Sequence, residues 1–137
     1  MKQIRKALYV ILVVLVVFLA VTAILGGIGI LTGINVPSVE ELKSSIFQGV
    51  TIPGLALLLI VGGGASWASM ALIRKLKLAM PLATAAGLTI LFFEFVEVLI
   101  IGSPAGVAQN LQILYFGVGT LIVAISICIW GIDLLAD

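Results

Sequence analysis

Long apolar runs separated by short polar segments dominate the pattern of this chain. The runs cover residues 8–31, 52–73, 81–101 and 111–132, and each is between 21 and 24 residues long. At about 1.5 Å per residue, a helix of that length crosses a hydrocarbon core roughly 30 Å thick. The pattern therefore predicts an all-α fold, a four-transmembrane-helix bundle that forms one domain over residues 1–137.

The composition supports the membrane interpretation. Of the 137 residues, 63% are hydrophobic and only 9% are charged, whereas soluble domains carry about 25% charged residues. A soluble fold of this length has too little interior to bury so much apolar surface. The mean hydropathy of +1.39 agrees with lipid as the main solvent.

The first apolar run has some features of a cleavable signal peptide. It follows a basic segment, residues 1–6, and contains Val21-Thr22-Ala23, which resembles a cleavage site. However, the apolar stretch continues to Leu31, and a signal core has only about 7–15 residues. We therefore interpret the run as a membrane helix.

The basic residues predict the orientation of the chain. Six of the seven lie before the first run or between the second and third runs, and the seventh is Lys43. Because cytoplasmic loops are enriched in lysine and arginine, both termini are expected in the cytoplasm. The six are Lys2, Arg5, Lys6, Arg74, Lys75 and Lys77.

The outer loop between the first two runs predicts a short amphipathic helix within residues 35–49. Ser38 and Glu41 have the spacing of a capping box, and three apolar residues fall on one helical face: Val39, Leu42 and Ile46. We expect this helix to lie flat on the outer membrane surface.

Each apolar run also has a stripe of small residues on one face. Small side chains let membrane helices approach closely, so the stripes predict helix packing, either inside one bundle or between copies. The stripes are Thr22, Gly26, Gly29 and Gly33; Gly62, Ser66 and Ser69; Ala79, Ala83 and Gly87; and Gly117, Thr120, Ala124, Cys128 and Gly131.

Two acids in the third run are the most informative residues of the sequence. Glu94 and Glu97 interrupt the apolar segment 92–98, and Glu94 shares a helical face with Ala83 and Gly87. A charge at that depth costs at least a few kcal/mol, so the acids are expected to be neutral, paired or hydrated. Glu94 should therefore point into the bundle.

Neutral polar residues that belong to the same half of the bundle are candidate partners of the acids. They are Gln48, Asn110, Gln112 and Tyr115. One interpretation is an outward-opening site for a proton, a cation or a small polar or amphiphilic ligand. The other is that these groups hydrogen-bond one another and fix the helix arrangement.

Few residues support enzymatic chemistry. The chain has no histidine, the commonest general base and metal ligand. Cys128 is the single cysteine, so it has no internal redox partner. We expect no enzymatic activity, no cofactor and no bound metal. The basic turn 74–77 is interpreted as a topology signal or a contact for anionic lipid headgroups, and nucleic acid is not expected as a partner.

A diffuse pattern extends from residue 52 to residue 119. It runs through Ile52-Pro53-Gly54-Leu55, Gly62-Gly63, the basic turn, Ala86-Gly87-Leu88, Ile100-Ile101-Gly102 and Gln112 to Gly117. It resembles small prokaryotic four-helix integral membrane proteins of uncharacterised function, and this resemblance implies fold and topology only. In that group the third helix often has Trp or Gln where this chain has acids. Small multidrug transporters differ, because their membrane glutamate lies in the first helix.

Two functional hypotheses follow for a multi-pass protein of a prokaryotic plasma membrane. The first is a non-enzymatic helical bundle that acts as a binding or accessory subunit, with membrane lipids, a second copy or a larger membrane complex as partners. The second is a small oligomeric transporter or channel in which Glu94 and Glu97 bind protons or cations. Acids sealed by side chains favour the first hypothesis, and a hydrated cavity that reaches them favours the second.

Overall fold

The computed structural model describes residues 2–32, 54–102 and 106–136, and these residues are almost entirely helical. Four continuous helical segments, the second made of η1 and α4 together, are long and apolar enough to cross a membrane, as predicted. The elements are α1 (Lys2–Leu31), the π-helix η1 (Ala56–Val61), α4 (Gly62–Ile73), α5 (Ala79–Ile101) and α6 (Val107–Ala136).

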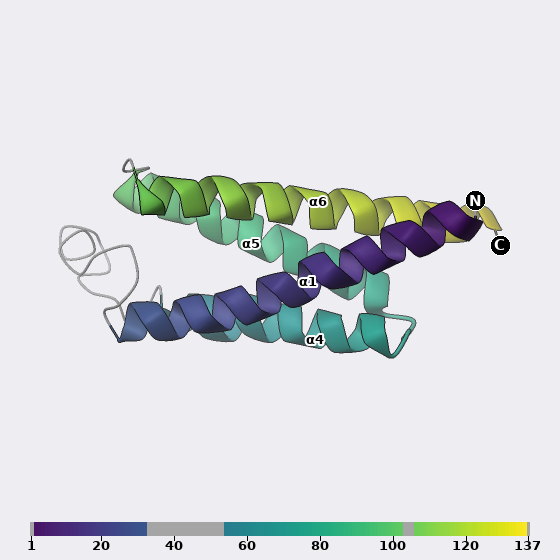
Figure 1. Ribbon diagram of the computed structural model, residues 1–137, viewed down its shortest axis with the longest axis horizontal. Helices are drawn as coiled ribbons and strands as arrows, with labels where there is room; N and C mark the ends of the chain where they lie inside the picture. Colours follow the sequence, from purple (N-terminus) through teal and green to yellow (C-terminus); the bar gives the residue numbers. More distant parts are fainter. Residues whose placement is uncertain (1, 33–53, 103–105, 137) are drawn as a thin grey trace.

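The helices form an antiparallel bundle (Figure 1). The most extensive contact joins α5 to α6, followed by the contact between α1 and α4, and α1 barely touches α5. Neighbours in space are therefore α1–α4, α4–α5, α5–α6 and α6–α1, with α1 and α5 on a diagonal. The first turn of α1, the α4–α5 turn and the last turn of α6 lie at one end (Figure 1), which we call the basic end because Arg5, Lys75 and Lys77 belong to it.

The helices differ from the apolar runs mainly at their ends. Helix α1 begins at Lys2 and α6 continues to Ala136, because polar residues beyond a membrane span can continue the same helix. Pro81 lies in the first turn of α5, where its missing N–H leaves no helical acceptor unpaired. The predicted amphipathic helix within 35–49 lies outside the described residues.

The second span is not a uniform α-helix. In η1 the backbone N–H of Gly62 bonds to the carbonyl of Leu57, five residues earlier. Helix α1 approaches this segment very closely, since a Cβ built on Gly27 would lie 2.8 Å from the backbone nitrogen of Leu58. Only glycine fits at position 27.

The turn between α4 and α5 ends helix α4 with a Schellman motif. The backbone N–H of Leu76 bonds to the carbonyl of Ala71, and that of Lys75 bonds to the carbonyl of Leu72. Lys75 has a φ of 54°, in the left-handed region that glycine usually occupies at this position. The turn reverses the chain within a few residues and sets α5 beside α4.

Close packing of α5 against α6 rests on two glycines. A Cβ on Gly87 would lie 3.0 Å from the carbonyl oxygen of Gly119, and one on Gly119 would lie 2.8 Å from the Ile90 side chain. A second link is the hydrogen bond of 2.8 Å between the hydroxyls of Thr84 and Ser126. Ser126 is completely buried, and its hydroxyl also donates to the Val123 carbonyl.

The structure places most of the predicted packing residues inside the bundle. Gly29, Ser69 and Ala83 are buried. A Cβ on Gly26 or Gly62 would contact Leu57 or Ile24. Six predicted packing residues are therefore buried or closely contacted by another helix: Gly26, Gly29, Gly62, Ser69, Ala83 and Gly87.

The predicted stripe of the fourth span lies outside the contacts within the bundle. Gly117 and Ala124 are exposed, and nothing lies within 4 Å of a Cβ built on Gly117. Helix α6 packs through a different face, on which Val118, Ile122 and Ile129 are buried. Ser66 of α4 is also exposed rather than packed.

Candidate functional site

The two acids of α5 lie together in the half of the bundle away from the basic end. Glu94 and Glu97 are one helical turn apart, so their side chains share a face. Glu94 is only 3% exposed, whereas Glu97 is partly exposed. The carboxyl groups lie close enough to interact with each other. Glu94 therefore points into the bundle, as its helical phase predicts.

Gln112 of α6 joins the two acids in what we call the polar cluster, defined as Glu94, Glu97 and Gln112. Its side-chain amide donates hydrogen bonds to Glu97 Oε2 at 3.3 Å and to the backbone carbonyl of Gly102 at 3.1 Å. Gln112 is 2% exposed. One buried side chain thus ties the end of α5 to the second turn of α6.

Two buried oxygens of the polar cluster lack a hydrogen-bond partner among the described residues. They are Glu94 Oε2 and Gln112 Oε1. An unpaired buried polar atom costs about 1–3 kcal/mol. The cluster is therefore partly satisfied, with hydrogen-bonding capacity left on both helices.

The other predicted site residues are distributed differently. Tyr115 is half-buried against the core, and its hydroxyl lies near the side chain of Thr22 and within electrostatic range of Glu94. Asn110, a candidate partner of the acids, is exposed, because α6 presents a different face to α5. Gln48 lies outside the described residues.

Helix α5 has an exposed face and a buried face, and Glu94 belongs to the buried one. Phe92, on the opposite face of α5 from Glu94, is exposed, while Ile90 is completely buried one turn below Glu94. The low exposure of Glu94 and Gln112 means that neighbouring side chains seal both groups. In the part of the chain that is described, no group of three or more His, Cys, Asp or Glu residues could hold a metal ion.

A long-range ion pair lies at the basic end. The Arg5 guanidinium donates to both carboxylate oxygens of Asp133, at 2.6 and 3.0 Å, and lies 5.5 Å from the centre of the Tyr9 ring. The Tyr9 hydroxyl donates to the carbonyl of Leu72. These contacts connect α1, α4 and α6. Sequence analysis identified these charges only as a topology signal, since pairing across 128 positions leaves no local pattern.

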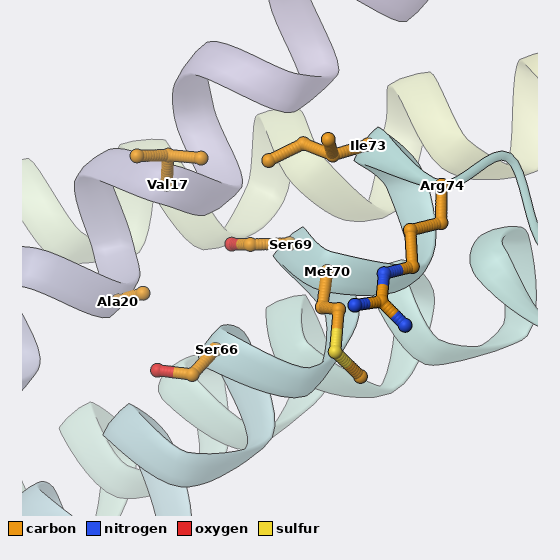
Figure 2. Close-up of a pocket in the computed structure, with 7 residues that line it drawn as sticks. All are labelled: Val17, Ala20, Ser66, Ser69, Met70, Ile73 and Arg74. Atoms are coloured by element: carbon orange, nitrogen blue, oxygen red, sulfur yellow. The ribbon is translucent and has the colours of Figure 1, made fainter.

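A groove between α1 and α4 opens to the outside of the bundle (Figure 2). Its volume is about 390 Å³. The hydroxyls of Ser66 and Ser69 donate to the carbonyls of Gly62 and Ala65 in their own helix, so the groove offers few free polar groups. It is lined by Val17, Ala20, Ser66, Ser69, Met70, Ile73 and Arg74.

No protein-family model, curated protein or solved structure matches this chain. The resemblance to small prokaryotic four-helix membrane proteins therefore stays a prediction.

Proposed function

We propose that the chain is a non-enzymatic membrane bundle that serves as a binding or accessory subunit of a membrane assembly. The observation that carries this proposal is the burial of Glu94 and Gln112, two of the three residues of the polar cluster. Glu94 and Gln112 are 3% and 2% exposed, and Gln112 links α5 to α6. A buried cross-link of this kind stabilises one helix arrangement, which is what a rigid subunit needs.

The exposed face of α6 supports association with another membrane helix. Gly117, Thr120 and Ala124 are exposed, and nothing lies within 4 Å of a Cβ built on Gly117 or Gly131. A lipid-facing surface gains little from small residues, whereas a helix–helix contact does, because small residues allow close approach. We infer that this face meets a partner helix.

A thiol-directed cross-linking experiment tests that contact. Cys128 is the single cysteine of the chain and is exposed on the same face of α6. A photoactivatable thiol reagent attached to it in native membranes is expected to give a protein adduct of defined mass. The matched control moves the thiol to the lipid-facing side of α5, as Cys128→Ser with Phe92→Cys. Equal adduct yields from the two positions, or none from Cys128, would overturn the proposed contact.

The unpaired oxygens of Glu94 and Gln112 favour a second candidate function. A small transporter would use the spare hydrogen-bonding capacity of the polar cluster to bind a proton or a cation. This alternative needs an opening that reaches the acids during turnover.

Reconstituted vesicles distinguish the two functions. For an accessory subunit, proton and potassium fluxes into vesicles with the purified protein should equal those of protein-free vesicles. The Glu94→Gln and Glu97→Gln double variant, which keeps the side-chain shape but cannot ionise, should behave identically. A flux that the wild-type protein produces and the double variant loses would sink the accessory-subunit proposal in favour of transport.

We further propose that the basic end is cytoplasmic and that the membrane is a prokaryotic plasma membrane. Support comes from the shared position of both termini and the α4–α5 turn at one end (Figure 1), together with the charge bias of that end. In a Cys128→Ala background, an impermeant thiol reagent added outside cells should label Ser45→Cys and not Lys75→Cys. The reverse labelling pattern would invert the topology.

A further inference from the structure

A pocket of about 570 Å³ lies at the basic end. Helix α1, the α4–α5 turn, the start of α5 and the end of α6 all contribute to it. Its lining is Arg5, Lys6, Tyr9, Val10, Lys75, Leu76, Lys77, Ala79, Met80 and Asp133. Segments that are far apart in the sequence thus bring four basic side chains around one cavity.

The charge of this pocket is only partly neutralised. Arg5 pairs with Asp133. Lys6, Lys75 and Lys77 are exposed, and none of the three forms an ion pair within residues 2–32, 54–102 and 106–136. Basic groups outnumber acidic groups by three in the lining. Such a cavity attracts an anion, and phosphate oxygens accept several charge-assisted hydrogen bonds at once.

Apolar walls distinguish the pocket from a site for a free anion. Val10 and Leu76 line it and are 59% and 46% exposed. Val14, one turn deeper on the same face of α1, is also exposed. Because the pocket lies where the apolar runs end, it sits at the level of lipid headgroups. A ligand that fits has an anionic head and an apolar tail that continues along α1.

We propose that this pocket binds one anionic phospholipid, with its phosphate among Lys6, Lys75 and Lys77 and its acyl chain along Val10 and Val14. This inference goes beyond the proposed function and does not depend on it. A topology signal requires only that basic residues lie on one side of the membrane. It does not require them to converge on a cavity with an apolar wall. Where Arg5 is occupied by Asp133, the lysines remain to bind the headgroup.

The experiment compares lipid retention by matched double variants. Purified protein in mixed detergent micelles is supplied with equal amounts of phosphatidylglycerol and phosphatidylcholine. Bound lipid is counted by native mass spectrometry, a measurement that does not depend on the orientation of the protein in the membrane. The pocket variant is Lys6→Gln with Lys77→Gln. The control is Lys2→Gln with Arg74→Gln, which removes the same charge from the same end, at two exposed positions that do not line the pocket.

The wild-type protein and the control variant should retain phosphatidylglycerol in preference to phosphatidylcholine. The pocket variant should lose roughly tenfold or more of that preference, since each basic group near an anionic lipid contributes about a fivefold change in affinity. The conservative variant Lys6→Arg with Lys77→Arg should retain the preference. Circular dichroism and elution as a single species exclude misfolding as the cause of a loss.

Three outcomes would overturn the proposal. Equal losses of the preference for phosphatidylglycerol in the pocket and control variants would show a general electrostatic attraction to the protein surface rather than a binding site. Equal retention of both lipids by the wild-type protein would show that the pocket does not select an anion. Displacement of phosphatidylglycerol by inorganic phosphate at a comparable concentration would identify a free anion, and not a lipid, as the ligand.

Discussion

The polar cluster and the basic end show two ways of keeping charge-bearing groups in a membrane bundle. In the polar cluster, Glu94 is sealed in the interior, beside the carboxyl group of Glu97. At the basic end, Arg5 and Asp133 form an ion pair at 2.6 Å, and their side chains are 38% and 41% exposed. Glu94 is accommodated by burial, whereas the Arg5–Asp133 pair is accommodated by contact with the membrane interface.

This difference shows that the depth of a polar group in the membrane, more than the number of charges, decides how much the group affects stability. An ionised group near the middle of a bilayer costs several kcal/mol, whereas a pair at the interface keeps much of its hydration and contributes at most about 1 kcal/mol. Substitutions in the polar cluster should therefore lower the free energy of unfolding more than equivalent substitutions at the basic end.

The largest expected effect comes from reversing a charge at each region. Glu94→Lys introduces a cation at a 3% exposed position and should lower the free energy of unfolding by about 3 kcal/mol. Asp133→Lys breaks the exposed ion pair and should cost less than about 1 kcal/mol. Both are measured by unfolding in mixed micelles with increasing SDS, followed by circular dichroism. Similar losses for the two variants would contradict the role assigned to depth.

A control separates charge from shape at Glu94. Glu94→Gln keeps the size of the side chain and cannot ionise, so it should retain most of the stability that Glu94→Lys loses. If Glu94→Gln were as unstable as Glu94→Lys, the carboxyl group itself would be needed for packing.

A smaller effect is expected from cutting the link between α5 and α6. Gln112→Leu removes the hydrogen bonds to Glu97 and Gly102 and should cost about 1–2 kcal/mol. Asn110→Leu, an exposed position two residues earlier, should change stability by less than about 0.5 kcal/mol. A double-mutant cycle with Glu97→Leu should show coupling, and strictly additive losses would argue against a direct contact.

The smallest effect should be found at the ion pair, together with a distinct response to salt. Arg5→Gln should cost less than about 1 kcal/mol in dilute buffer. Near 1 M salt, where the screening length is about 3 Å, the cost should fall further. The cost of Gln112→Leu should be the same in both buffers, because the Gln112 side chain is buried away from ions. A salt-sensitive cost at Gln112 would mean that water reaches the cluster.

The lengths of the apolar runs were sufficient to predict the four helices, because a membrane span must satisfy its backbone hydrogen bonds internally. The inward direction of Glu94 was also predictable, since it shares a face with the buried Ala83. The π-helical turns of η1 were not, because they depend on the close approach of Gly27 to Leu58. Such a contact between two spans leaves no periodic pattern in either one.

The face of α6 could not be assigned from its sequence alone. Small residues occur on two sides of this helix, at Gly117 and at Gly119, and only Gly119 meets α5. In water, the apolar side of a helix identifies the face toward the core. In lipid, both sides are apolar, so the choice depends on which neighbour the bundle supplies. The same uncertainty explains why the sequence did not show that Gln112, and not Asn110, is buried beside the acids.

The left-handed lysine at the end of α4 has a consequence for protein engineering. A side chain with a Cβ in that conformation is less favourable than glycine by about 1 kcal/mol, and Lys75 has a φ of 54°. Exchange for glycine would relax the local backbone while deleting one cation beside the lipid surface. Lys75→Gly should therefore raise thermal tolerance and, at the same time, weaken the attraction to acidic membranes.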